Sequence, residues 1–300
     1  MADQSSEADP TIIGLGEVLW DLLPEGKQFG GAPANFAYHA KQFGADAHVV
    51  SAVGDDDLGR EILGRLDGLG VHRRLVAVDA EHPTGTVSVE LDEHGKPDFT
   101  IHTGVAWDFI PDMPGLAELA ARADAVCFGS LAQRSEVSRA TIRRFLDATG
   151  DGCLRVFDIN LRQHYFNAEV IAESLRHADV LKLNDDELPV VAELLSLPAG
   201  EGPFLDAVLP QHDLRLVALT KGAAGSVLRS RDGTSAMPGT RVNVADTVGA
   251  GDSFTAAVVM GLLAGRELDA INRRANDVAA YVCTQSGATP DLPGHLVRFS

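Results

Sequence analysis

The chain has 300 residues, of which 45% are hydrophobic, so it can bury a sizeable core in one α/β domain with a small appendage or in two modest domains. Its formal net charge is −18 at pH 7 and no basic patch is visible, which argues against nucleic acid as a partner. No apolar run reaches the length of a membrane span, so we expect no membrane partner either.

The N-terminus and the cysteines favour a cytoplasmic protein. Residues 1–10 are polar and acidic, and they lack the basic and apolar regions of a signal peptide. Cys127, Cys153 and Cys283 stand singly in apolar stretches, without metal-binding spacing, and their odd number argues against a disulfide framework. We therefore expect three small core thiols in a reducing compartment.

Apolar patterns in the first quarter of the chain predict strands over residues 11–16 and 47–53 and helices over residues 34–43 and 58–69. Gly30 and Gly31 precede the first helix and allow a strand to end close to a ligand. Pro33 suits the first turn of that helix. The acidic turn of residues 54–57 precedes the second helix, and we interpret it as a helix cap rather than a metal site.

Residues 84–91 and 98–102 alternate apolar and polar side chains, and a turn with glycine over residues 92–95 separates them. This pattern predicts a hairpin with one apolar face. Because two isolated strands are only marginally stable, we expect residues 17–31 to supply a further strand to the same small sheet. Trp107 and Phe109 follow, and the pattern leaves open whether they pack at a hinge or line a ligand pocket.

From residue 115 onward, strands and helices alternate. The predicted strands cover residues 124–129, 154–158, 180–183 and 214–220, and the predicted helices cover residues 135–149, 168–177, 187–195, 255–264 and 269–284. Such alternation predicts a parallel sheet with helices on both faces, whose ligands bind at the carboxyl ends of the strands. Polar residues occur at those ends: Asp158, Asn160, Arg162, Lys182, Asn184, Glu187, Thr220, Lys221 and Gly222.

The most informative stretch is residues 246–254, a glycine-rich turn that runs into an apolar helix. Gly249 and Gly251 permit a tight turn without side chains that would crowd a ligand. The backbone N–H groups of this turn and the helix dipole form an anion site. A carboxylate belongs there if Asp252 takes a proton from a hydroxyl while Gly249, Ala250 and Gly251 stabilise a transferring phosphoryl group. Capping alone would not require two glycines.

Residues 246–252 resemble the C-terminal signature of the ribokinase-like (PfkB) sugar kinases, and residues 30–37 resemble their N-terminal signature. With the segments between and around them, the resemblance covers nearly the whole chain. It implies one ribokinase-like α/β domain over residues 1–300, with a doubly wound, mostly parallel sheet flanked by helices. It also implies a small β-sheet lid formed by about residues 17–31 and 84–103.

The resemblance also assigns residues to ligands. It places the sugar against Asp21, Gly30, Gly31, Asn35 and Arg162, and it places ATP against Asn184, Thr220, Lys221, Gly222, Gly225, Asn276 and Ala280. It implies that Glu187 holds Mg²⁺ through water and that K⁺ binds beside Asp246, near residues 287–289. One carboxylate together with phosphates is sufficient for Mg²⁺, which keeps several of its waters.

Residues 14–24, which precede the double glycine, most resemble the fructokinases. The implied reaction is transfer of the γ-phosphoryl group of ATP to a primary hydroxyl of a small sugar, with fructose as the expected substrate. Kinases of ribose or 2-keto-3-deoxygluconate remain alternatives. So does a catalytically silent regulator that binds sugar or nucleotide on the same fold. The exposed face of the lid leaves a homodimer open.

Overall fold

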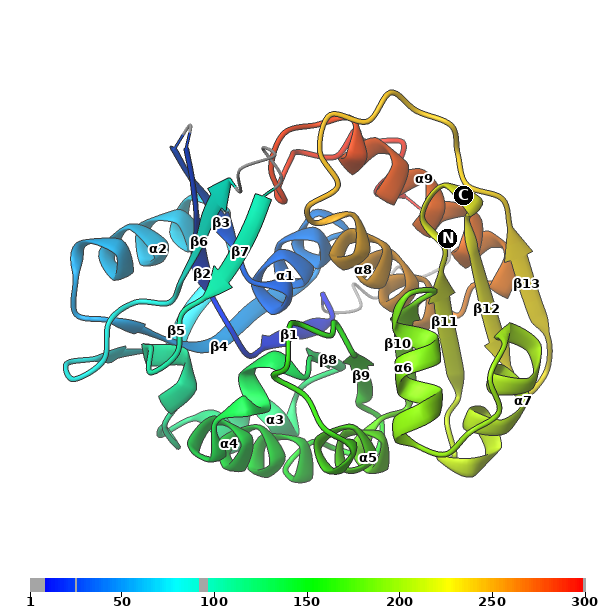
Figure 1. The fold of residues 1–300 in the computed structure, drawn as a ribbon, viewed down its shortest axis with the longest axis horizontal. Coiled ribbons are helices and arrows are strands. Elements are labelled where there is room, and N and C mark those ends of the chain that lie inside the picture. The colour runs from blue at the N-terminus through cyan, green and yellow to red at the C-terminus, as the bar shows by residue number, and fades with distance from the viewer. Residues whose placement is uncertain (1–8, 25, 92–96, 299–300) are drawn as a thin grey trace, which may run out of the picture.

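The core of the fold is a nine-stranded sheet in the order β13-β12-β11-β10-β9-β8-β1-β4-β5 (Figure 1). The structure is a computed structural model that describes residues 9–24, 26–91 and 97–298. All neighbouring strands from β11 to β5 run parallel. Strand β12 pairs antiparallel with β11, and β13 pairs antiparallel with β12. The strands are β1 (Thr11–Leu15), β4 (Asp46–Gly54), β5 (His72–Asp79), β8 (Ala125–Phe128), β9 (Leu154–Asp158), β10 (Val180–Asn184), β11 (Leu216–Thr220), β12 (Ser226–Ser230) and β13 (Thr234–Met237).

Helices cover both faces of this sheet, as the alternation of strands and helices predicts (Figure 1). One layer contains α3 (Leu116–Ala121), α4 (Glu136–Asp147), α5 (Ala168–His177), α6 (Glu187–Leu194) and α7 (Glu201–Gln211). The other contains α1 (Ala32–Gln42), α2 (Asp57–Gly68), α8 (Ala250–Leu263) and α9 (Leu268–Cys283). The expected doubly wound α/β class is thereby confirmed.

Helix α8 lies in the middle of its layer, between α1 and α9. This placement explains why its side chains are apolar nearly all round: residues 253–261 are all buried. Each buried Val or Phe side chain contributes on the order of 1.5–3 kcal/mol through removal of apolar surface from water. The large apolar contact area fixes the N-terminal turn of α8 relative to the strand ends.

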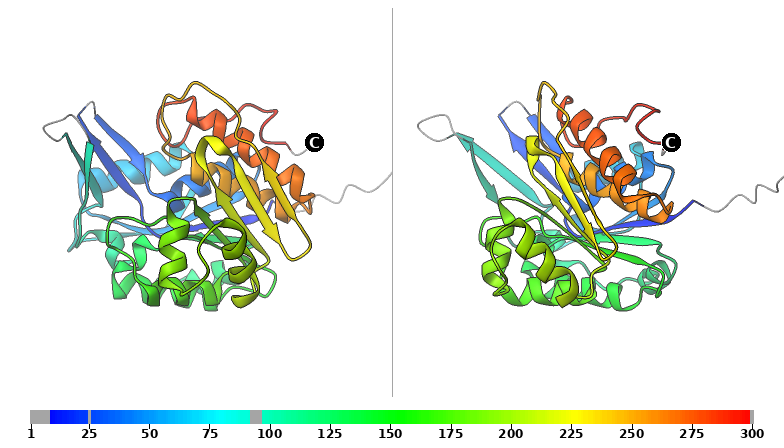
Figure 2. Two further views of the ribbon diagram at one scale, coloured as in Figure 1. Left: turned by 45° about the vertical axis from the view of Figure 1, so that its right-hand side comes forward. Right: turned by 90° about the vertical axis from the view of Figure 1, so that its right-hand side faces the viewer.

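A second sheet of four strands stands beside the large one, in the order β3-β2-β6-β7 (Figure 2). It consists of β2 (Leu19–Leu23), β3 (Gly26–Gly30), β6 (Thr86–Leu91) and β7 (Pro97–Ile101). Trp20 of β2 pairs in parallel register with Thr86 of β6, which joins the predicted hairpin to the predicted partner segment. The turn expected over residues 92–95 lies outside the described residues.

Some elements were not predicted, namely α3, β5, α7 and β13, whereas β12 was expected as the strand after the turn of residues 220–226. Strand β5 is at the edge of the sheet and begins with three basic or imidazole residues, so it lacks the apolar run of a buried parallel strand. Helix α7 carries two prolines, which obscure the helical pattern. Helix α8 begins at Ala250 and not at residue 255, because glycines in its first turn masked the start.

The cysteine prediction is confirmed in part. Cys127 and Cys153 are buried free thiols, whereas the free thiol residue Cys283 is only half-buried at the end of α9. Within residues 9–24, 26–91 and 97–298, every helix is too short or too polar to cross a bilayer.

Candidate active site

The first turn of α8 has the backbone arrangement of an anion site. Gly249 precedes the helix with φ of +78°, a left-handed conformation that favours glycine. Because α8 begins at Ala250, the N–H groups of Gly251 and Asp252 have no acceptor within the helix. The N–H of Ala250 instead donates to the carbonyl oxygen of Thr247 at 3.3 Å. The expected set of converging N–H groups is therefore smaller than the sequence predicted.

The carboxylate of Asp252 lies beside the first turn of α1. Asn35 of that turn donates from Nδ2 to Asp252 Oδ2 at 2.8 Å, and Asn35 itself is buried. Burial raises the pKa of Asp252 to about 6, and the nearby charge of Asp158 adds to the rise, while the Asn35 hydrogen bond opposes it. A carboxyl group with a pKa near the working pH can both accept and release a proton.

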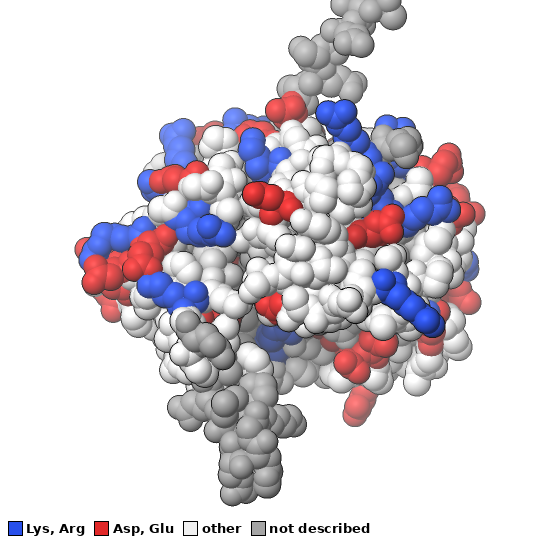
Figure 3. Space-filling view, turned by 90° about the horizontal axis from the view of Figure 1, so that it is seen from above, with Lys and Arg blue, Asp and Glu red and all other residues white. Residues whose placement is uncertain are grey.

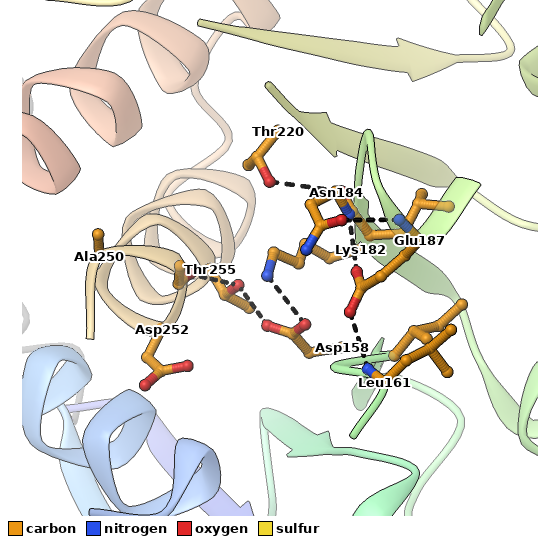
Figure 4. Close-up of polar contacts among 12 residues, drawn as sticks. Asp158, Leu161, Lys182, Asn184, Glu187, Thr220, Ala250, Asp252 and Thr255 are labelled. Atoms are coloured by element: carbon orange, nitrogen blue, oxygen red, sulfur yellow. Dashed lines mark hydrogen bonds and ion pairs between the residues drawn. The ribbon is translucent and has the colours of Figure 1, made fainter. Parts of the chain in front are cut away.

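Three side chains from three elements form a hydrogen-bonded network next to Asp252 (Figure 4). Lys182 of β10 donates from Nζ to Asp158 Oδ1 at 3.0 Å, and its Cα is the register partner of Asp158 in β9. The hydroxyl of Thr255 in α8 lies 3.0 Å from Asp158 Oδ2. All three residues are buried, so the network is held in place away from water.

Lys182 also approaches the first turn of α8. A Cβ atom on Gly251 would lie 3.1 Å from Lys182 Nζ, so glycine leaves room for the ammonium group there. Burial alone would lower the pKa of Lys182, but the carboxylates of Asp158 and Glu187 outweigh that effect and raise it. The result is a fixed positive charge at the N-terminus of a helix, where an anionic ligand would be stabilised. The sequence placed Lys182 only at a strand end, and the structure shows that it is buried.

Glu187 begins α6 and is held by two backbone groups (Figure 4). Its Oε1 accepts from Leu161 N and its Oε2 from Asn184 N, both at 2.8 Å, and Asn184 Oδ1 accepts from Glu187 N at 2.8 Å. Burial raises the pKa of Glu187, whereas Lys182 lowers it. Because each carboxylate oxygen keeps one acceptor position, Glu187 can bind water of a hydrated Mg²⁺ and fits the expected role in that form.

The residues expected to contact sugar come from the small sheet, from the start of α1 and from the loop after β9. Asp21 of β2 is half-buried; burial raises its pKa to about 6 against the lowering effect of Arg162. Gly30 carries no side chain where the Asp21 carboxylate lies, since a Cβ there would be 2.7 Å from Oδ2. Gly31 has φ of +111°, which again favours glycine.

Arg162 is exposed, and its guanidinium donates to the carbonyl oxygen of Leu161 at 3.1 Å. Its positive charge lowers the pKa values of Glu17, Asp21 and Asp252.

Glu17 was not predicted as a site residue, yet it lies near the same charges. Its side chain is 2% exposed, and burial raises its pKa to about 7, while Arg162 lowers it and Asp252 raises it. Among the residues that the structure describes, Glu17 Oε2 and Asn35 Oδ1 are buried polar atoms without a hydrogen-bond partner. Such atoms are uncommon in native structures and can mark a place where a ligand or water completes the bonding. The sequence signal was an acid directly after a buried strand.

The residues expected to contact nucleotide come from the ends of β10 and β11, from the turn after β11 and from α9. Thr220 ends β11 and is the register partner of Asn184, while Gly222 and Gly225 belong to the following turn. Lys221 Nζ donates to Glu201 of α7 at 3.1 Å, so its charge is partly neutralised at the surface. Asn276 and Ala280 are half-buried residues on α9.

The amide of Asn276 is already bonded within a buried polar cluster. Its Nδ2 donates to Ser226 Oγ at 2.6 Å and to the Asn272 carbonyl oxygen at 2.8 Å. Asn276 therefore anchors α9 to β12, and only Ala280 of this pair offers an apolar surface free of polar bonds.

Asp246 lies beside residues 287–289, as expected. Its Oδ2 accepts from Gly287 N at 3.1 Å, and a Cβ on Gly249 would come within 2.5 Å of the Ala288 carbonyl oxygen. Both carboxylate oxygens are engaged, since Oδ1 accepts from Val248 N at 3.0 Å. The Ala288 carbonyl oxygen also lies 2.9 Å from Nε2 of the buried His39.

Trp107 and Phe109 pack against different neighbours. Trp107 is fully buried, and the Arg134 guanidinium lies 3.9 Å from its ring centroid. Phe109 stacks on His82 with a centroid distance of 3.6 Å. Gly85, which precedes β6, closely approaches Trp107, so Trp107 packs next to the small sheet. The contacts of both rings are packing contacts.

The face seen from above carries acidic and basic side chains side by side around an uncharged central region (Figure 3). No basic stripe crosses this face of the described residues, so anions must be bound by local groups rather than by a broad positive surface.

The fold and these groups are those of a doubly wound α/β protein with an anion site at a helix N-terminus. Residues 25–294 match the family model described as pfkB family carbohydrate kinase, and the chain therefore belongs to that family. The family is one of carbohydrate kinases, so the chain is a sugar kinase.

A fructokinase of Klebsiella pneumoniae is 32% identical over 93% of this chain and 95% of its own length. A sugar kinase of Pyrococcus horikoshii, solved as a complex with ATP, is 28% identical, with a TM-score of 0.76 and 93% of each chain covered. A fructokinase of Vibrio cholerae, solved with fructose, ADP and calcium, is 25% identical, with a TM-score of 0.80 and coverage of 98% of this chain and 99% of that one.

Proposed function

We propose that this sugar kinase is a fructokinase that transfers the γ-phosphoryl group of ATP to a primary hydroxyl of fructose. The observation that carries the proposal is the position of Asp252, a carboxylate of pKa about 6 at the N-terminus of α8, between Asn35 and the Asp158–Lys182–Thr255 network. The relatives named fructokinase support fructose as the substrate.

In this proposal Asp252 is the general base. Its carboxylate takes the proton of the attacking hydroxyl, the hydroxyl oxygen bonds to the γ-phosphorus, and the bond from that phosphorus to the β-bridging oxygen breaks to release ADP. With a pKa of about 6, Asp252 is mostly ionised at pH 7 and can accept that proton. The remaining task is positioning and charge stabilisation, which dominate phosphoryl transfer.

The charge on the transferring group is stabilised by the first turn of α8 and by Lys182. The N–H groups of Gly251 and Asp252 have no helical acceptor, and the Lys182 ammonium group lies beside Gly251. These groups are fixed before ligand binds, so they need not reorganise during the reaction. Mg²⁺, held through water by Glu187, would neutralise further phosphate charge when bound.

The sugar is held by Asp21, Asn35 and Arg162, with Gly30 and Gly31 allowing close backbone approach. A carboxylate, an amide and a guanidinium match hydroxyl groups that both donate and accept. One neutral sugar suits this set better than an acidic sugar, because Arg162 is the one cation we assign to it. The whole chain acts as one domain, with the small sheet closing over the sugar to exclude water.

The nucleotide extends along the turn of residues 220–225 toward α9. Thr220, Lys221, Gly222 and Gly225 serve the phosphates and ribose, Asn184 lies beside them, and Ala280 contributes to the adenine wall. Asn276 supports that wall through its hydrogen bonds to Ser226 and Asn272. A monovalent cation beside Asp246 would fix the turn that precedes α8.

A coupled ADP-release assay with Mg-ATP and K⁺ tests the substrate over a panel of six acceptors: fructose, ribose, 2-keto-3-deoxygluconate, fructose 1-phosphate, fructose 6-phosphate and adenosine. We expect the highest kcat/KM for fructose. If another acceptor exceeds fructose by more than about tenfold, which is 1.4 kcal/mol of discrimination, the fructokinase assignment is wrong. If none is turned over, a silent regulator is favoured.

A further inference from the structure

A second cluster of polar side chains lies on strands β4 and β5 at the edge of the large sheet (Figure 1). Asp46 and His48 are two residues apart on β4, so their side chains point to the same face. His72 of β5 is the register partner of His48 in a parallel pair, which places it beside them. The strand geometry therefore gathers two imidazoles and one carboxylate at one spot.

The distances within this cluster are short. His48 Nε2 lies 3.0 Å from Asp46 Oδ2, and His72 Nε2 lies 3.0 Å from Asp46 Oδ1. The imidazole centroids are 4.7 Å apart with an angle of 30° between the rings. One ligand atom from each of the three residues lies within 4.8 Å of the other two.

A β-bulge contributes to this arrangement. Between the register pairs His48–His72 and Val50–Leu75, β4 has one residue and β5 has two. The extra residue in β5 bends the strand locally and re-aims its side chains, and bulges of this kind often lie at functional sites. The side chains are also accessible: His72 is 58% exposed, Asp46 34% and His48 12%.

We propose that Asp46, His48 and His72 bind a divalent transition-metal ion of the zinc class. Two imidazole nitrogens and one carboxylate oxygen are a common zinc donor set, with a water in the fourth position. A tetrahedral ion with bonds of about 2.1 Å separates its ligand atoms by roughly 3.4 Å. The three donors lie within 4.8 Å of one another, so the pair that is farthest apart would have to approach by at most about 1.4 Å. The ion would replace the two protons that the imidazoles now share with Asp46.

This site is separate from the candidate active site. Asp46, His48 and His72 stand at the beginnings of their strands, whereas Asp158, Asn184 and Thr220 stand at the ends of theirs. Parallel strands place these two sets at opposite edges of the sheet. Bound metal would cross-link the edge strand β5 to β4, and so it would stabilise the fold without entering the kinase reaction.

The test uses the full chain after removal of metal with a chelator, followed by titration with ZnSO₄ in a calorimeter. We expect one saturable site and a rise in Tm of about 5 °C when Zn²⁺ is present at about a hundred times its Kd. Titration with Co²⁺ should give visible absorption bands of a four-coordinate ion. Absence of saturable binding, or a Tm that does not rise, would overturn the proposal.

Two variants locate the ion. His72→Gln removes one metal ligand at an exposed position. Loss of a residue that only hydrogen-bonds to a metal ligand weakens metal binding by about 10–100-fold, so loss of a ligand itself should weaken Zn²⁺ binding by more than that. His82→Gln is the matched control. His82 also pairs with an aspartate, Asp79 at 2.8 Å, but it does not belong to the group formed by Asp46, His48 and His72. Equal Zn²⁺ affinity in His72→Gln and the native chain would place the ion elsewhere and reject the site.

A third variant should change the affinity in the other direction. The charge of Arg122 acts on both Asp46 and His48 and opposes a cation between them. Arg122→Gln should therefore bind Zn²⁺ more tightly than the native chain, and weaker binding would contradict the site. Kinase activity in all these variants should match the native chain, which separates this test from that of the proposed function.

Discussion

The two sides of Asp252 differ in how completely their polar groups are bonded before any ligand arrives. On one side, Asp158, Lys182 and Thr255 form the strand-end network, in which each side chain has a partner at about 3.0 Å. On the other side, which we call the open side, Glu17 Oε2 and Asn35 Oδ1 are buried without a partner among the described residues.

This difference fits the two ligands of a sugar kinase. A phosphoryl group in transfer is stabilised best by dipoles and charges that are already fixed, as in the strand-end network. Selection among sugars depends on hydroxyl groups that complete unfinished hydrogen bonds, because an analogue without the hydroxyl leaves a buried partner unpaired. Substitutions at Asp252, Lys182 and Glu17 test whether the two sides differ in this way.

The largest effect is expected at Asp252, which lies between the two sides. Asp252→Asn keeps the size of the side chain and an oxygen that can accept from Asn35, but it removes the proton acceptor. We expect kcat to fall by about 10²–10⁴-fold, the usual contribution of a general base. The Kd for sugar, measured by calorimetry, should change little.

Asp291→Asn is the control for this variant, since it removes an equal charge from an exposed residue that bonds Tyr38 instead. The native enzyme should also lose kcat/KM as the pH falls through about 6, because Asp252 then becomes protonated. An Asp252→Asn enzyme that keeps more than half of the native kcat would reject Asp252 as the base.

The next effect tests the strand-end network through stability. Lys182→Met leaves Asp158 as a buried carboxylate with Thr255 as its remaining partner. Removing one member of a buried ion pair costs about 3–5 kcal/mol, so the free energy of unfolding should fall by that amount. Urea unfolding followed by circular dichroism measures it.

Lys221→Met supplies the comparison for Lys182→Met, because Lys221 pairs with Glu201 at the surface at 3.1 Å. A surface pair contributes about 0–1 kcal/mol, so this variant should remain close to the native stability. Equal losses in the two variants would mean that the strand-end network is not held more firmly than a surface pair.

The smallest effect concerns Glu17 on the open side. Its pKa is raised from 4.5 to about 7 in the folded chain, mainly by burial, so the folded state binds the proton more tightly than the unfolded state. The stability from this group is fully present below pH 4.5 and is lost as the pH rises through 7. The whole loss is about 3 kcal/mol.

Glu17→Gln removes this titration. Urea unfolding at pH 5 and pH 8 should therefore show that the variant gains stability relative to the native chain at the higher pH. Glu118→Gln, at an exposed position of α3, is the control. If the native chain and Glu17→Gln lose stability equally between these pH values, Glu17 is not a buried unpaired acid.

Much of the fold followed from patterns that are local in the sequence. The alternation of strands and helices predicted the doubly wound sheet, and the period-two pattern of residues 84–102 predicted the hairpin of the small sheet. Edge strand β5 and helix α7 were not predicted, because an edge strand with basic residues and a helix with two prolines lack those patterns.

The residue types available for the reaction can be read directly from the sequence: the glycine-rich turn with Asp252, the double glycine before Asn35, and the polar residues at the strand ends. Their burial and their partners depend on how the chain packs. Lys182 could have faced solvent, but strand register pairs it with Asp158 and packing of α8 brings Gly251 against it. Glu17 became a buried acid for the same reason: burial and charge proximity depend on segments far apart in the chain, which no local pattern encodes.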